Sequence, residues 1–316
     1  MLIKIRLQLL WVLGLGAQVL LVVMLYLANR LDTKDLTNVF KRAITNGLNT
    51  FDTAYAYAKG QSERILGELI SDFPRKDVLI SDKFTPGFQN NQVENPVLDM
   101  LDGSLKRLST DYIDIYWIHN AADIEKWTSY LVDVFKSGKV KRLGVSNHSL
   151  EQVKRVQEIL KPFGIKISAV QNHFSLLYRQ SIDSGLLKYC QENNIEFFSY
   201  MVLEQGTLSG KYNKNNHLPE NSNRGKTYNP LFPKLKTLLA ELDRISEKYG
   251  VSSAEITMAW AIKKGTTPII GMTKTEQVDD AVKAINLNIT TEEINNLEQI
   301  AIASGVNTRG GWEGNA

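Results

Sequence analysis

The sequence is poor in the side chains that make disulfides and metal sites. Cys190 is the only cysteine among 316 residues, so the chain has no intramolecular disulfide framework and no site built from several thiolates. Of the four histidines, His148, His173 and His217 lack the spacing of metal ligands. We therefore predict no metal, and the single thiol favours a reducing compartment, the cytoplasm.

The sequence also lacks a charge excess of one sign and a glycine-rich dinucleotide motif. Its 37 basic and 34 acidic residues are scattered, giving a net charge of +3 and no basic stripe for nucleic acid. No Gly-x-Gly-x-x-Gly opens a helix after a strand, which excludes a Rossmann fold. No linker rich in proline, glycine or serine divides the chain, so we predict one domain over residues 1–316.

After Leu31, short apolar runs alternate with longer amphipathic stretches, which is typical of parallel strands joined by helices. The predicted helices are 35–46, 62–73, 95–108, 124–137, 150–160, 181–193, 233–249 and 253–264. The predicted strands are 49–52, 78–81, 112–118, 142–145, 169–171, 196–200 and 268–270. These seven strands are one fewer than a closed (β/α)8 barrel requires.

The amino-terminal residues 1–30 are atypically apolar and allow more than one interpretation. Residues 7–28 carry no charge and follow Lys4 and Arg6, which meets the length and flank rules for a membrane anchor. A closed barrel, however, leaves only the apolar segment containing Leu13-Gly14-Leu15-Gly16 for its first strand. We therefore predict an α/β chain forming a (β/α)8 TIM barrel. Membrane contact through residues 7–28 is less favoured, and a shifted reading frame over residues 17–30 is a third hypothesis.

Polar side chains recur where the apolar runs end. In a barrel of parallel strands the carboxyl ends all meet at one face, where the chemistry of such barrels takes place. Each residue alone has an ordinary structural explanation, but a polar rim on one face has no packing rationale. The sequence therefore predicts a polar pocket there. Its members are Asp52, Lys83, His119, Ser146, Asn147, Gln171 and Asn172.

Three segments carry a family resemblance. They are Phe51-Asp52-Thr53-Ala54-Tyr55-Ala56-Tyr57, Ser81-Asp82-Lys83-Phe84 and the strand from Asp111 to His119. In this order they resemble the signatures of the aldo-keto reductase family, in which an aspartate precedes the catalytic tyrosine by five positions. The resemblance implies a (β/α)8 barrel and the catalytic set Asp52, Tyr57, Lys83 and His119.

Further segments resemble the family's cofactor loops. Gly144-Val145-Ser146-Asn147 is similar to the loop that binds the nicotinamide amide, and Tyr200 to the ring that stacks on nicotinamide. Lys274 and Thr273 stand near an expected helix start, where a cation and a hydroxyl hold a 2′-phosphate, so NADPH is favoured over NADH. The implied cofactor residues are Ser146, Asn147, Gln171, Tyr200, Leu203, Gln205, Gly206, Leu208, Gly210, Lys211, Gly271, Thr273, Lys274 and Gln277.

The resemblance implies an NADPH-dependent oxidoreductase that reduces a small aldehyde or ketone to an alcohol. Tyr57 is expected to donate the proton, with its pKa lowered by Lys83, while Asp52 orients Lys83 and His119 positions the carbonyl oxygen.

Two other interpretations stay open. One is a cofactor-binding regulatory subunit with little turnover, attached to a membrane; the other is an inactive copy whose barrel does not close. Both draw on departures from the family pattern. These are the residues after Gly16, Met201-Val202 in place of Ser-Pro, and Ala281 in place of asparagine.

Overall fold

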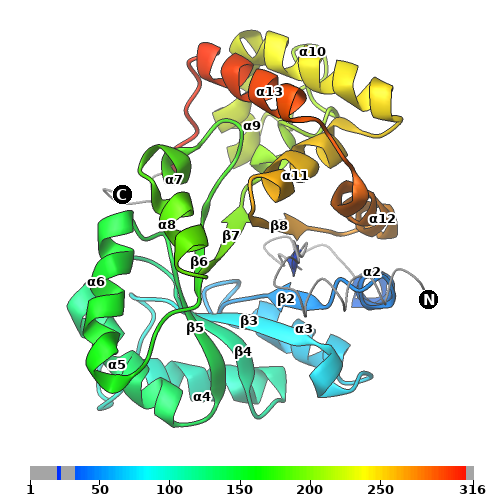
Figure 1. Cartoon of the computed structure of the whole chain (residues 1–316). Helices are drawn as coiled ribbons and strands as arrows, with labels where there is room; N and C mark the ends of the chain where they lie inside the picture. Colours follow the sequence, from blue (N-terminus) through cyan, green and yellow to red (C-terminus); the bar gives the residue numbers. More distant parts are fainter. Residues whose placement is uncertain (1–19, 23–32, 311–316) are drawn as a thin grey trace.

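The computed structural model describes residues 20–22 and 33–310, in which eight parallel strands form a closed barrel surrounded by helices (Figure 1). Neighbours in the barrel follow chain order, and β1 pairs with both β2 and β8. The strands are β1 (Leu20–Val22), β2 (Thr50–Asp52), β3 (Leu79–Phe84), β4 (Ile113–Ile118), β5 (Val140–Ser146), β6 (Ala169–His173), β7 (Glu196–Tyr200) and β8 (Thr267–Gly271).

Helices surround the barrel, and most of them bury one side against the core. Several begin with side-chain caps, for example Ser149, Ser252 and Thr290, whose hydroxyls accept from the backbone three residues later. The helices are α2 (Thr33–Thr45), α3 (Gln61–Ile70), α4 (Pro96–Leu108), α5 (Ile124–Lys136), α6 (Leu150–Leu160), α7 (Gln180–Asp183), α8 (Leu186–Glu192), α9 (Asn223–Tyr228), α10 (Phe232–Tyr249), α11 (Ser253–Lys263), α12 (Thr275–Asn286) and α13 (Thr291–Ala303).

The first strand, β1, lies within the apolar amino-terminal segment. The prediction placed a strand there because the rest of the chain supplied only seven of the eight that a closed barrel needs. Leu20–Val22 closes the gap between β2 and β8, whereas Leu13-Gly14-Leu15-Gly16 lies outside the described residues. The hypothesis of a barrel that does not close is therefore wrong. Among the residues that the structure describes, no helix is both long and apolar enough to cross a membrane, and most of residues 7–28 lie outside that part.

One predicted helix is interrupted in the structure, so its prediction as a single helix is wrong. Residues 181–193 were expected to form a single helix, but they form most of α7 and all of α8, separated by Ser184 and Gly185. Gly185 has a φ of 79°, a left-handed conformation that an α-helix does not contain. The chain therefore turns between the two short helices at the residue most tolerant of that conformation.

The barrel interior contains a small apolar cluster beneath the polar rim. Trp117 packs edge-on against Phe198, with ring centroids 5.3 Å apart, and Ile115, Ala169 and Ile269 complete the cluster. Trp117 fits because β5 has Gly144 opposite it; a Cβ at this position would clash with the indole ring. This cluster, the barrel floor, fills the interior of the barrel. The site therefore forms above it, at the carboxyl ends of the strands.

Candidate active site

Asp52 and Lys83 form a buried ion pair at the carboxyl ends of β2 and β3. The Lys83 ammonium contacts Asp52 Oδ2 and donates to the carbonyl oxygen of Thr53 at 2.9 Å, and both side chains are at most 2% exposed. Burial alone would lower the pKa of Lys83, but Asp52 and then Tyr57 raise it above its usual value. Lys83 is therefore charged at neutral pH.

Other polar groups hold the second carboxylate oxygen of Asp52. Ser81 Oγ donates to Oδ1 at 2.5 Å, and Gln171 Nε2 donates to the same oxygen at 3.0 Å. Trp117 Nε1 donates in turn to Ser81 Oγ at 2.7 Å. Asp52, Lys83 and Gln171, all predicted from the sequence, thus meet in one network, which also contains Ser81 and Trp117, to which the sequence pattern assigned no role.

Tyr57 lies between Lys83 and His119. The Lys83 ammonium is 4.8 Å from the centroid of the Tyr57 ring, and the Tyr57 and His119 rings are 5.7 Å apart at an angle of 82°. Burial raises the pKa of Tyr57, and Lys83 offsets only part of that rise. The predicted net lowering of this pKa is therefore wrong, although the contribution of Lys83 has the predicted sign.

His119 follows β4 directly and is oriented by a threonine. Thr85 Oγ1 lies 2.8 Å from His119 Nδ1. Burial, with a further contribution from Lys83, lowers the pKa of His119 to about 3, so its imidazole is neutral at physiological pH. When the Thr85 hydroxyl donates to Nδ1, the proton of the neutral ring resides on Nε2, which then has a hydrogen-bond donor to offer.

A second group of predicted residues lies beside the first. Asn147 Nδ2 donates to the carbonyl oxygen of His119 at 2.9 Å and to Ser146 Oγ at 3.2 Å. The Tyr200 hydroxyl donates to Asn147 Oδ1 at 2.5 Å, which joins the ends of β5 and β7. Asn147 has a φ of 61°, a left-handed conformation that asparagine adopts more readily than most residues. The structure thus places Ser146, Asn147 and Tyr200 next to the predicted catalytic residues.

The loop after β7 carries six predicted cofactor residues on an unusual backbone. Positive φ angles occur at Met201 (61°), Glu204 (45°), Gln205 (53°) and Gly206 (102°). Such conformations are costly for residues other than glycine and are found at functional sites. In this loop Gln205, Gly210 and Lys211 are exposed, Leu203 and Gly206 are partly buried, and Leu208 is buried.

The remaining predicted cofactor residues gather at the start of α12, after β8. The backbone N–H groups of Thr273 and Lys274 both donate to Gln277 Oε1, at 2.7 and 3.0 Å. Gly271 and Lys274 are exposed. These residues form a group of their own at the amino end of a helix, where the helix dipole favours an anion. Ala281, farther along α12, is fully buried.

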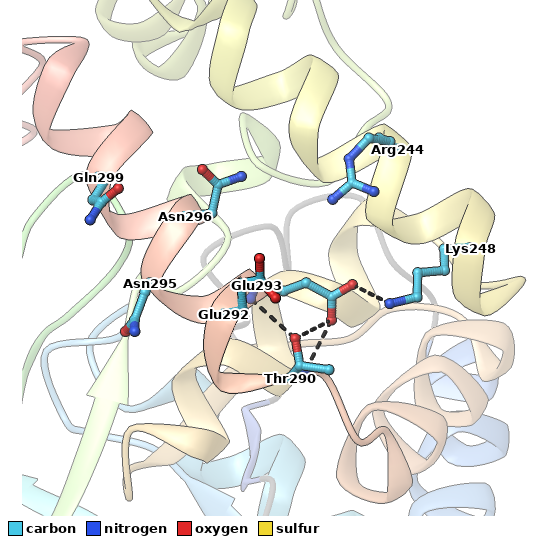
Figure 2. A pocket seen from close by; sticks show the side chains of 8 residues that line it. All are labelled: Arg244, Lys248, Thr290, Glu292, Glu293, Asn295, Asn296 and Gln299. Atoms are coloured by element: carbon cyan, nitrogen blue, oxygen red, sulfur yellow. Dashed lines mark hydrogen bonds and ion pairs between the residues drawn. The ribbon is translucent and has the colours of Figure 1, made fainter.

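A groove of about 720 Å³ lies elsewhere, between α10 and α13 (Figure 2). The groove is lined by side chains of both charges, among them Arg244, Lys248, Glu292 and Glu293. None of the predicted site residues lines it. Glu293 there accepts from Lys248 Nζ at 2.7 Å and from the backbone N–H of Thr290 at 2.9 Å, as the cap of α13. The groove is therefore separate from the candidate active site.

Asp82 is a buried carboxyl that the predicted chemistry does not use. Successive side chains of a strand point to opposite faces, so Asp82 points away from the site that holds Lys83. Burial, followed by the nearby Glu63 carboxyl, raises the pKa of Asp82 to about 8. A group with a raised folded-state pKa stabilises the fold fully below its unfolded pKa of about 4, and this stabilisation is lost as the pH rises through about 8.

Asp82→Asn is therefore expected to change how stability depends on pH. Relative to the variant, the wild-type protein should lose stability between about pH 4 and about pH 8.5, on the order of a few kcal/mol in the free energy of unfolding. Urea denaturation at both pH values measures the difference, with the exposed Asp72→Asn as control. Parallel pH curves for wild type and Asp82→Asn would show that Asp82 is charged in the folded protein at neutral pH.

Comparisons with known proteins point to one family. The model of the Aldo/keto reductase family matches residues 13–302. A pyridoxal reductase from chloroplasts of Arabidopsis thaliana is 30% identical, covering 84% of this chain and 76% of its own. L-glyceraldehyde 3-phosphate reductase from Escherichia coli O157:H7 is 30% identical, covering 83% and 82%.

A comparison with solved structures supports the same family. A glycerol dehydrogenase from Gluconobacter oxydans superimposes with a TM-score of 0.76 at 25% identity over 88% of both chains. The family match covers most of the described residues, including every predicted catalytic and cofactor residue. This chain therefore belongs to the aldo/keto reductase family, whose members are oxidoreductases that reduce carbonyl groups.

Proposed function

We propose that the protein is an NADPH-dependent carbonyl reductase in which Tyr57 donates a proton to the oxygen of an aldehyde or ketone. The observation that carries this proposal is the position of the Lys83 ammonium, paired with Asp52 and 4.8 Å from the centroid of the Tyr57 ring. A buried tyrosine beside a charged ammonium is suited to releasing its proton, because the developing phenolate is stabilised where it forms.

The raised pKa of Tyr57 is compatible with this role. A phenol with a raised pKa stays protonated at neutral pH, which is the state a general acid needs before reaction. As the proton moves to the substrate oxygen, negative charge grows on the phenolic oxygen, and the attraction of Lys83 grows with it. Asp52 acts through Lys83 by holding its ammonium in place.

His119 is suited to positioning the substrate oxygen. Its imidazole is neutral, and a donor on Nε2 supplies a hydrogen bond to a carbonyl without competing for the Tyr57 proton. Thr85 holds the ring from the other side at Nδ1. The carbonyl oxygen would then accept from both Tyr57 and His119, which fixes its orientation as the proton moves.

The residues at the carboxyl ends of β5 to β8 fit a nicotinamide dinucleotide. Asn147, Ser146 and Gln171 offer amide and hydroxyl groups for a carboxamide beside the Tyr200 ring, while Lys274 stands exposed at the start of α12 for a phosphate. The cofactor, when bound, supplies the hydride. The adjoining residues orient it and, with the barrel floor, exclude water from the reacting carbon.

The test is NADPH oxidation at neutral pH with a panel of aldehydes and ketones. Pyridoxal and glyceraldehyde 3-phosphate belong in the panel because they correspond to the names of two relatives. Turnover of any of these compounds supports the proposal. NADPH binding without turnover would instead favour a cofactor-binding regulatory protein, and absence of binding would overturn both functions.

Lys274→Glu is expected to weaken NADPH specifically. Reversing this charge places a carboxylate where we propose a 2′-phosphate, so the KM for NADPH should rise about tenfold, equivalent to ~1.4 kcal/mol, with little change for NADH. Steady-state kinetics with both cofactors measures the effect, and the exposed Lys236→Glu on α10 is the matched charge reversal. Equal losses for the two cofactors would place the 2′-phosphate elsewhere.

A further inference from the structure

Glu204 is a fully buried carboxylate with four side-chain donors. Its Oε1 accepts from His173 Nε2 at 2.9 Å, from Thr308 Oγ1 at 2.7 Å and from Ser175 Oγ. Its Oε2 accepts from the Tyr228 hydroxyl at 2.7 Å. Burying a charged carboxylate is costly unless its lone pairs are satisfied, so this number of donors indicates that the site is built around the charge.

Glu204 belongs to the loop that we propose lies along the cofactor. It begins the short 3₁₀ turn Glu204–Gly206, and the other two residues of that turn, Gln205 and Gly206, are proposed cofactor residues. The left-handed angles at Met201, Glu204 and Gln205 cost energy that interactions elsewhere in the loop have to offset. The hydrogen bonds of the Glu204 carboxylate are suited to hold the loop in this shape.

The same carboxylate is connected to Tyr200 through His173. A carboxylate only accepts, so His173 carries a proton on Nε2 when it bonds Glu204. The His173 ring stacks on Tyr200 at 5.6 Å and on Tyr178 at 4.4 Å, each at an interplanar angle of 22°. Glu204 thus orients His173, and His173 supports the ring that we propose stacks on nicotinamide.

Glu204 is also connected to the carboxyl-terminal segment, through Thr308. Thr308 lies 104 residues from Glu204 in the chain, and its backbone N–H also donates to the carbonyl oxygen of Leu177 at 3.4 Å. The segment after α13 is therefore attached to the loop after β7 and to the turn after β6. Tyr228, at the end of α9, attaches the same carboxylate to the helical insertion between β7 and β8.

We propose that Glu204 is a positioning residue that couples cofactor binding to docking of the carboxyl-terminal segment. This inference rests on the proposed binding of NADPH by the loop after β7. It requires that the carboxylate hold the loop and Tyr200 in the conformation that accepts the cofactor, and that the bond to Thr308 contribute to that conformation. Loss of either partner then weakens NADPH binding while the catalytic residues stay intact.

The test compares two buried glutamates. Glu204→Gln keeps the shape of the side chain but removes its charge and one acceptor. Glu293→Gln makes the same change in a buried glutamate that caps α13 beside the groove in Figure 2, where it accepts from Lys248, Tyr249 and Thr290. Both variants should lower Tm. Only Glu204→Gln is expected to raise the Kd for NADPH, about tenfold, with kcat at saturating NADPH changed less than about threefold.

Thr308→Val tests the coupling and does not depend on Glu204→Gln being stable. It should raise the Kd for NADPH about threefold. The double variant Glu204→Gln with Thr308→Val should raise the Kd by less than the product of the two single-variant factors, because Thr308→Val removes, and Glu204→Gln weakens, the same bond. Fluorescence titration of the purified full chain with NADPH gives each Kd. An unchanged Kd in Thr308→Val, or equal Kd changes in Glu204→Gln and Glu293→Gln, would overturn the coupling. Failure of the wild-type protein to bind NADPH would overturn the proposed function itself.

Discussion

Tyr57→Phe is expected to lower kcat for carbonyl reduction by about 10²–10⁴-fold while NADPH still binds, because proton donation by a positioned group contributes that much. The substitution removes one hydroxyl and keeps the ring that packs edge-on against His119 and beside the Lys83 ammonium. Single-turnover and steady-state measurements with the best aldehyde of the panel give kcat, and fluorescence titration gives the Kd for NADPH.

Tyr55→Phe is the matched control for that experiment. Tyr55 lies two residues earlier in the same segment, but its ring packs against the Arg107 guanidinium at 4.7 Å and against Phe88 at 6.1 Å. Its hydroxyl has no part in the proposed chemistry, so kcat should change less than about twofold. Full activity in Tyr57→Phe would assign proton donation to another group, with His119 the nearest candidate.

Lys83→Met is expected to destabilise the protein by roughly 3–5 kcal/mol as well as abolish turnover, because it leaves a buried charge unpaired. The Asp52 side chain is 2% exposed, and Lys83 is its only cationic partner within the described network. Chemical denaturation of wild type and variant at pH 7 measures the loss in the free energy of unfolding.

The double variant Asp52→Asn with Lys83→Met separates the electrostatic cause from a packing defect. Removing both charges eliminates the unpaired carboxylate, and the introduced amide still has an oxygen to accept from Ser81 and Gln171. Most of the lost stability should return, while activity stays absent. A double variant as unstable as Lys83→Met alone would show that the methylene packing of Lys83, and not its charge, supports the barrel.

Much of the fold follows from local patterns. Seven apolar runs of strand length, separated by amphipathic stretches, predicted seven strands that the structure contains, and the shortage of one strand predicted that the apolar amino-terminal segment supplies the eighth. Interruptions of a helix shorter than one turn are harder to predict from the sequence. The break at Ser184 and Gly185 sits inside an otherwise helical pattern, because one glycine alone is compatible with either outcome.

The candidate site was predicted to the extent that its residues end consecutive strands. Asp52, Lys83, His119, Ser146 and Gln171 gather at one face because parallel strands in a closed barrel end at the same side. The roles of these residues stay predictions that the kinetic experiments test. The partners that orient them, Ser81 and Thr85, belong to the same strand ends but carry no pattern that distinguishes them from other hydroxyl residues.

The sequence by itself determined the alternation of strands and helices and the order of the polar residues along the chain, because both depend on local periodicity and spacing. Only the tertiary structure decided the net direction of the Tyr57 pKa, since burial by distant segments outweighs the neighbouring Lys83. It alone brought Glu204 to Thr308 and His173, because hydrogen bonds between residues up to 104 positions apart depend on how the barrel closes and where its last segment returns.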